Sequence, residues 1–170
     1  MSFTVQQFQA NVRELARQYQ FELEVVFPVI IGSSKLINML IFSSTQPGRK
    51  IDPTGDLAFM GMEYKLASNI TYPQWTGNFR IDDNYDLLKS WRAWQELVHG
   101  TATNISAFPA QYKSNINLYR LDNGGNRIIQ ITLNGAWPTN LTVTGLDTKT
   151  REPIQADVTI QYDNNTLTVL

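Results

Sequence analysis

A strong turn signal between two alternating segments constrains the fold of this chain more than any other feature. The pentapeptide at residues 122–126, Asp-Asn-Gly-Gly-Asn, separates residues 112–121 from residues 127–136. Asn-Gly and Gly-Gly pairs favour the tight turns of β-hairpins, and apolar residues alternate with polar ones in both flanking segments. The sequence therefore predicts an antiparallel hairpin.

The register of this hairpin depends on which residues form its loop. An Asn123-Gly124 loop places Asn117 opposite Gln130, and a Gly124-Gly125 loop shifts the pairing by two residues in sum. The first register also places Asn115 opposite Thr132, Lys113 opposite Asn134, Leu118 opposite Ile129 and Ile116 opposite Ile131. Both registers keep the two faces separate, so we expect one apolar face and one uncharged face of Asn, Gln and Thr.

Further strands and two helices complete the expected fold. Period-two alternation predicts strands over residues 20–27, 74–82 and 154–162, and shorter strands over 36–43 and 62–66. Helical periodicity predicts an N-terminal helix over 4–17 and a second helix over about 84–99, with Asp83 as its cap. These elements predict one domain over residues 1–170: an antiparallel β-sandwich or open barrel with one packed helix and an N-terminal helix.

Two segments lack a clear place in this fold. Residues 44–61 contain two prolines and three glycines with little periodicity, and they predict a long loop or extended arm. Residues 163–170 predict a C-terminal tail.

Composition excludes several classes of function. The chain has 170 residues, no cysteine and a net charge of −1, which argues against thiolate chemistry and against a basic nucleic-acid-binding surface. No apolar run is long enough to span a bilayer and no signal-peptide pattern is present, so we expect the protein to be made and kept in a cytoplasm, or assembled from one.

Candidate catalytic residues have simpler structural explanations. His99 lies at a helix end, Asp82-Asp83 suits helix capping, and Gly124-Gly125 suits a turn. Glu22 and Glu24 share a strand face, which favours a solvated or interface surface over a carboxylate pair for acid–base work. Trp75, Trp91 and Trp94 fit the core. We therefore predict no catalytic residues, no cofactor and no metal site.

Four motifs follow one another through the central and C-terminal parts of the chain. They are Trp75 in an alternating strand, a helix over 87–95 with Trp94-Gln95 at its end, Pro109-Ala110-Gln111-Tyr112-Lys113 before the next strand, and Gly135-Ala136-Trp137-Pro138-Thr139-Asn140. In this order they resemble the strand tryptophan and the "W-Q", "P-A-x-Y-K" and "G-x-W-P-T-N" motifs of the tail tube proteins of contractile-tailed bacteriophages. The resemblance spans about residues 57–162 and implies a structural virion protein, not an enzyme.

The resemblance implies an assembly as well as a fold. Subunits of that family form hexameric rings whose inner sheets join into one barrel, and the rings stack into a tube that conducts DNA into the host. It implies contacts with the tail sheath, baseplate and tail terminator, a location in the virion tail after assembly in the host cytoplasm, and no membrane insertion by this chain.

Two sets of residues are expected to serve this assembly. The set expected to face the lumen is polar and nearly uncharged: Lys113, Asn115, Asn117, Gln130, Thr132 and Asn134. Such a lining suits DNA passage because a basic lining would hold the DNA by its phosphates. The face formed by Gln74, Thr76, Asn78 and Arg80 is the competing candidate. The inter-ring arm is expected to use Pro47, Ile51, Leu57, Phe59 and Met60, and to become ordered only on assembly.

Alternative functions remain at this point. A bacteriocin or secretion tube subunit, or the tube-initiating baseplate protein, would share the fold and the assembly. A carbohydrate-binding β-sandwich would need exposed aromatic side chains, for which Trp137 and Tyr119 are the candidates. A small hydrolase is the third alternative.

Overall fold

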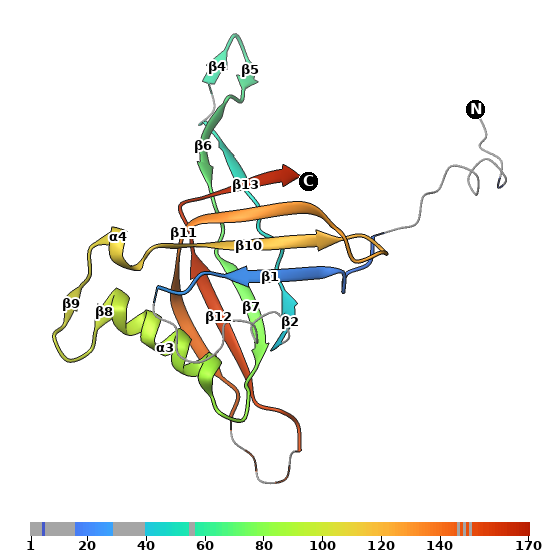
Figure 1. Cartoon of the computed structure of the whole chain (residues 1–170). Coiled ribbons are helices and arrows are strands. Elements are labelled where there is room, and N and C mark those ends of the chain that lie inside the picture. Colours follow the sequence, from blue (N-terminus) through green and yellow to red (C-terminus); the bar gives the residue numbers. More distant parts are fainter. Residues whose placement is uncertain are drawn as a thin grey trace.

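The computed structural model describes residues 16–28, 40–54, 57–145 and 151–170, together with positions 5, 147 and 149; for residues 57–59 it describes the backbone alone. The helix expected over 4–17 therefore lies almost wholly outside the described residues, as do residues 36–39 of the strand expected over 36–43. The remainder of that strand is observed as β2 (Ile41–Ser44). Figure 1 shows the arrangement.

One antiparallel path of strands forms the body of the molecule. Its order is β1–β10–β11–β12–β7–β2, and β13 also pairs with β11. These strands are β1 (Phe21–Val25), β7 (Trp75–Arg80), β10 (Ser114–Leu121), β11 (Arg127–Val143), β12 (Gln155–Gln161) and β13 (Asn164–Val169). Within the described part of the chain β1 and β2, the two ends of the path, do not pair with each other, so the structure is an open barrel.

The 17-residue strand β11 belongs to two sheets. Its first half pairs with β10 on one side and β13 on the other, which together with β1 forms what we call sheet A. Its second half pairs with β12, which leads through β7 to β2 and forms sheet B. The two sheets are therefore joined by one continuous strand.

Gly135 lies where β11 passes from sheet A to sheet B. The register of β10 and β11 shifts between Ser114 and Ile116, so an extra residue is accommodated there as a bulge. Gly135 has φ 65°, and a Cβ at this position would overlap a carboxylate oxygen of Asp163. Only glycine fits both requirements without strain.

Helix α3 (Asp86–Val98) contributes two tryptophans to the core. Trp91 and Trp94 are fully buried and stack with ring centroids 5.6 Å apart, and Phe27 meets both rings edge-on. Trp75 is also buried, at 1% exposure. The predicted core role of these three tryptophans is confirmed.

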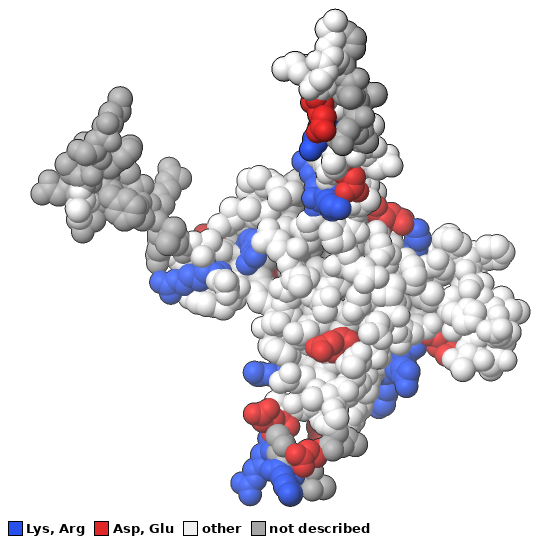
Figure 2. Space-filling model, turned by 180° about the vertical axis from the view of Figure 1, so that it is seen from behind, with Lys and Arg blue, Asp and Glu red and all other residues white. Residues whose placement is uncertain are grey.

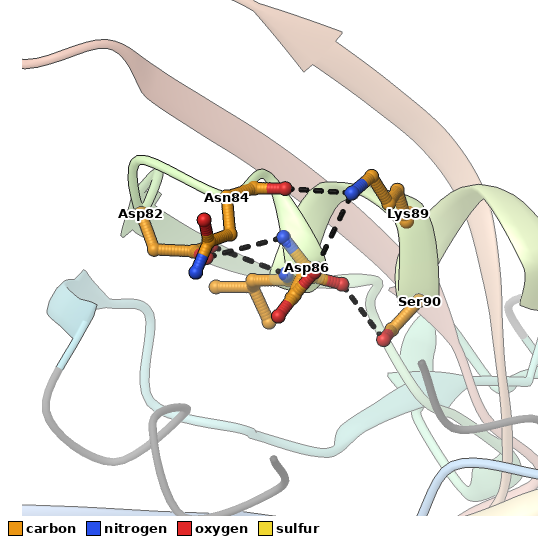
Figure 3. A network of polar contacts seen from close by, with 6 residues as sticks. Asp82, Asn84, Asp86, Lys89 and Ser90 are labelled. Carbon is orange, nitrogen blue, oxygen red and sulfur yellow. Dashed lines mark hydrogen bonds and ion pairs between the residues drawn. The ribbon is translucent and has the colours of Figure 1, made fainter. Parts of the chain in front are cut away.

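The cap of α3 differs from the one expected. The carboxylate of Asp82, not Asp83, accepts the backbone N–H groups of Asp86 and Leu87, each at 3.2 Å (Figure 3). The reason is the left-handed conformation of Tyr85, with φ 58°, which precedes the helix and brings the chain back towards Asp82. Residue spacing alone does not reveal the left-handed Tyr85, so it points to Asp83 as the cap.

The hairpin expected from the turn signal is present in the second register. Asn117 lies opposite Thr132, and Leu118 opposite Ile131, which are the pairs expected from a Gly124-Gly125 loop. The pairing shifts between Arg120 and Leu121, so Leu121 lies opposite Arg127 and residues 123–125 form the loop. The Asp122 carboxylate accepts the N–H groups of Gly124 and Asn126 at 2.7 and 2.8 Å, and Gly125 has φ 82°. The Asn123-Gly124 register is not observed, but the two faces remain separate as expected.

Residues 44–71 differ most from expectation, since strands replace much of the loop. β3 (Lys50–Pro53) pairs with β6 (Ala67–Thr71), and β4 (Leu57–Phe59) pairs with β5 (Met62–Tyr64). Met60 and Gly61 both have positive φ and form a two-residue turn of the kind that favours hairpins. We call these four strands the ribbon; Figure 1 shows that it projects away from the sheets.

A second, shorter extension follows α3. Strands β8 (His99–Gly100) and β9 (Ile105–Ser106) pair, and the single-turn helix α4 (Pro109–Tyr112) leads into β10. The C-terminal residues expected as a tail form β13 and extend sheet A.

Candidate functional site: the polar face of sheet A

Side chains on sheet A alternate strictly between two faces. One face contains the buried side chains Leu23, Leu118 and Ile131, which lie side by side on neighbouring strands. The other face is polar across all four strands. Its central row is Glu24, Asn117, Thr132 and Thr166, and the row beside it is Glu22, Tyr119, Gln130 and Thr168.

A hydrogen-bond network fixes the middle of the polar face. Thr132 donates its hydroxyl to Asn117 Oδ1 at 2.9 Å, and the Gln130 amide donates to both of these side chains at 3.1 and 3.3 Å. A separate bond connects β11 with β13, where the Asn134 amide donates to Asn164 Oδ1 at 2.7 Å. The middle of the face therefore consists of neutral side chains that hydrogen-bond one another.

The structure brings five of the six residues expected at the lumen onto this face. Asn115 lies at the bulge, where Gly135 donates its N–H to the Asn115 side chain at 3.4 Å. Lys113 lies before β10 and forms an ion pair with Asp163 at 2.7 Å, so it sits at the end of the face and not within a strand. The set comprises Asn115, Asn117, Gln130, Thr132 and Asn134.

Sequence reasoning missed the contribution of β13. Asn164, Thr166 and Thr168 extend the polar rows, while Leu167 and Val169 lie on the opposite side of the same strand. The signal was available, because polar and apolar residues alternate from 164 to 169.

The charged end of the face was also missed. Arg127 donates to Glu22 at 2.8 Å, the Tyr119 hydroxyl donates to Glu24 at 2.9 Å, and the Arg127 guanidinium lies 3.8 Å from the Tyr119 ring centre. Burial, followed by the hydrogen bond to Glu24, raises the pKa of Tyr119. The hydrogen bond to Glu22 raises the pKa of Arg127. Each glutamate thus has its own partner.

Other candidate residues have structural partners. Both ring nitrogens of His99 are within hydrogen-bond distance of the loop that follows α3, at Ser106 and Asn104. Trp137 packs edge-on against Tyr112, and Tyr119 is only 6% exposed, so neither presents a flat open surface to a sugar. Among the described residues, no group of three or more His, Asp or Glu side chains is placed to hold a metal ion.

Charge is dispersed over the face of the molecule that Figure 2 shows. On the face seen in Figure 2, Lys and Arg lie among Asp and Glu without an extended patch of one sign. None of the helices that the structure describes is long and apolar enough to cross a membrane.

Sheet A has two strand edges that no described strand covers. β1 pairs only with β10, and β13 pairs only with β11, among the residues that the structure describes. On β1, Gln20 and Val26 bond to β10 through their backbone, so Leu23 and Val25 direct theirs outwards, whereas the Phe21 N–H already donates to the Tyr19 carbonyl at 3.0 Å. On β13, the Leu170 N–H bonds to β11, so by the same alternation Leu167 and Val169 direct their backbone outwards.

Comparison with known proteins places the chain in one family. A family model described as phage tail tube protein matches residues 2–167. The tail tube protein gp19 of Enterobacteria phage T4 is 26% identical over 110 residues, covering 63% of this chain and 68% of that protein, and gp19 of phage T6 matches equally.

Solved structures show the same fold at low identity. A chain of the anti-feeding prophage baseplate matches with a TM-score of 0.71 and 12% identity, covering 92% of this chain and 97% of its own. The tube terminating cap of the same particle matches with a TM-score of 0.68, 16% identity and 94% coverage of both chains. A chain of an extracellular contractile injection system sheath–tube complex covers 99% of this chain at a TM-score of 0.62 and 15% identity. The chain belongs to the phage tail tube protein family and is a structural protein of the virion tail, not an enzyme.

Proposed function

We propose that this chain forms hexameric rings that stack into the tube of a contractile phage tail, and that the polar face of sheet A lines a lumen through which DNA passes. The observation that carries the proposal is the match between the two open edges of sheet A. The strands β1, β10, β11 and β13 alternate in direction, so β13 of one copy is antiparallel to β1 of the next.

The two edges also match in the parity of their residues. On β1 the residues that direct their backbone outwards, Leu23 and Val25, are also those whose side chains face the core. On β13 the outward residues Leu167 and Val169 lie on that same core-facing side. Pairing Leu23 and Val25 with Leu167 and Val169 gives ladder hydrogen bonds without a flip of either face, which a mismatch of one residue would force.

The composition of the polar face supports a lumen. A basic lining would bind phosphates and release counterions, which would hold DNA in place. Here Arg127 is paired with Glu22, and Lys113 with Asp163, so neither cation at the face is without a carboxylate partner. The Gln74, Thr76, Asn78 and Arg80 face belongs to sheet B, whose strands supply neither of the two matching edges.

The ribbon suits contact between rings. Met60 is 90% exposed and Met62 is 73% exposed, and Ile51 lies opposite Ile70 with both about half exposed. Pro47 is half-buried at the base, and Leu57 and Phe59 belong to β4. Exposed apolar side chains on a projecting ribbon are typical of an interaction surface. We further propose that the assembled tube contacts sheath, baseplate and terminator proteins.

Hydrogen exchange on subunits and on assembled material tests the proposal. The backbone N–H groups of Leu167 and Val169 should exchange fast in the free subunit and slowly in rings, because they gain partners only there. Thr166 and Thr168, whose N–H groups already face β11, provide the internal control. Electron microscopy should show rings or hollow tubes. A chain that remains monomeric at high concentration, or outward amides that stay unprotected in assembled tubes, would contradict the proposal.

A further inference from the structure

An open cleft lies at the seam between the two ends of the strand path. It has a volume of about 450 Å³. One wall comes from sheet A, with Phe21 of β1 and Leu118 and Arg120 of β10, and the other comes from residues 42–46 in and after β2. The cleft is therefore on the core-facing side of sheet A, beside the open edge of β1.

An exposed apolar surface lies at the opposite edge of the same sheet. Across sheet A, the row of core-facing side chains is Leu23, Leu118, Ile131 and Leu167. The first three are 0%, 2% and 3% exposed, whereas Leu167 is 63% exposed and its neighbour Val169 is 71% exposed. The row thus continues onto β13 beyond the part of sheet A that the core covers.

We propose that Leu167 and Val169 of one copy fill the seam cleft of the next copy. This inference rests on the proposed ring and identifies the surface that makes it specific. When β13 joins the open edge of β1, parity keeps Leu167 and Val169 on the core-facing side, where the cleft lies. Within one copy, a row of core-facing side chains runs from Phe21 through Arg120 and Ile129 to Val169. In the ring, Val169 at the end of this row would lie next to the cleft beside Phe21 of the next copy.

The occupant is a second copy of this chain because its β13 combines the required direction with exposed apolar side chains on the core-facing side. The edge beside the cleft accepts an antiparallel strand whose outward residues are also core-facing, and β13 has both properties. The lining of the cleft includes Phe21, Phe42 and Leu118, which offer apolar contact to aliphatic side chains, beside Arg120 and the polar residues 43–46. An unrelated strand would need the same direction and the same apolar pattern.

Substitutions on the two faces of β13 test the side-chain contact. The Leu167→Asn, Val169→Asn double variant should raise the concentration needed for assembly about tenfold or more, because it removes two apolar groups from a buried contact. The matched control is Thr166→Asn, Thr168→Asn, which places the same side chains on the polar face and should assemble as the unmodified chain does. Circular dichroism and thermal melting of the subunits establish that both variants fold.

Cysteine cross-linking tests the location directly, since the chain has no cysteine of its own. Ser44→Cys protein mixed with Val169→Cys protein should give an oxidised dimer in assembled material. No such dimer should form when Thr168→Cys replaces Val169→Cys in the mixture. Neither Cys variant alone should form it either.

The outcomes separate this inference from the proposed function. Two results would overturn the inference and leave the tube intact. One is that tubes form equally well from the Leu167→Asn, Val169→Asn variant. The other is that the thiol of the Ser44→Cys variant reacts with maleimide as fast in tubes as in subunits. Failure of the unmodified chain to form rings or tubes at any concentration would overturn the proposed function and this inference with it.

Discussion

At the scale of single residues, Asp82 shows how a local conformation decides which side chain acts. Asp82 and Asp83 are adjacent carboxylates before the same helix, but only Asp82 accepts the first helical N–H groups. The left-handed Tyr85 causes this, and Lys89 and Ser90 complete the network around the first turn (Figure 3).

Replacement of Asp82 should therefore destabilise the subunit more than replacement of Asp83. We expect Asp82→Ala to lower the free energy of unfolding by about 1 kcal/mol, because two helix N–H groups lose their acceptor. Asp83→Ala is the matched control and should change stability by less than about 0.5 kcal/mol. Urea denaturation of both variants measures the difference, and equal losses would contradict the assignment.

At the scale of elements, sequence reasoning was reliable where one face of an element is buried. The strands at 20–27, 74–82 and 154–162 and the helix near 84–99 were predicted because burial imposes a strict period on their residues. The ribbon has no such constraint, since both of its sides are largely exposed and none of the side chains described between 44 and 71 belongs to the buried core. Its Met60-Gly61 turn also lacks the usual Asn-Gly signal.

The part of the polar face on β10 and β11 was predictable, because burial of the opposite face imposes a strict alternation there. The turn at 122–126 identified the residues of β10 and β11 that share the face, but two registers were consistent with it. Sequence could not decide that Asn117 pairs with Thr132, because the choice depends on the bonds of the Asp122 carboxylate within the turn. Nor could it show that residues 164–169 return to β11, which is a non-local pairing.

The ribbon should be separable from the rest of the subunit. Replacing residues 55–65 with Asn-Gly joins Thr54 to Leu66, whose backbones already bond at 2.6 Å, and removes no side chain that the structure describes in the core. We expect a folded subunit that forms rings but no longer stacks them into tubes. Circular dichroism and electron microscopy measure the two properties.

A milder variant provides the control for this truncation. Met60→Asn retains Gly61 and produces a favourable hairpin turn, so the ribbon keeps its shape and loses one exposed side chain. It should still stack. Normal tube growth from the truncated chain would remove the ribbon's proposed role.

At the scale of the whole molecule, the two candidate linings differ in which sheet faces the channel. Thr166 is exposed on the polar face of sheet A, and Gln74 is exposed just before β7 of sheet B. A lysine at either position would bind DNA, but only a lysine inside the tube would hold DNA where a nuclease cannot reach it.

Thr166→Lys tubes should therefore retain short duplex DNA that resists nuclease at low salt and is released as salt rises. Gln74→Lys tubes should bind only nuclease-sensitive DNA. Nuclease digestion followed by gel analysis of the retained DNA measures this. Protection by the Gln74→Lys variant alone would assign the lumen to sheet B.

The single strand shared by both sheets has a consequence for how the subunit fails. Because β11 contributes ladder bonds to sheet A with one half and to sheet B with the other, neither sheet can come apart without losing part of its neighbour. Unfolding of one sheet alone therefore also breaks hydrogen bonds of the other sheet, and we expect heat or denaturant to unfold the whole body in one transition. Such a subunit stays folded until it unfolds completely. An assembly built from it would therefore weaken by the unfolding of whole subunits and not by partial unfolding within each subunit.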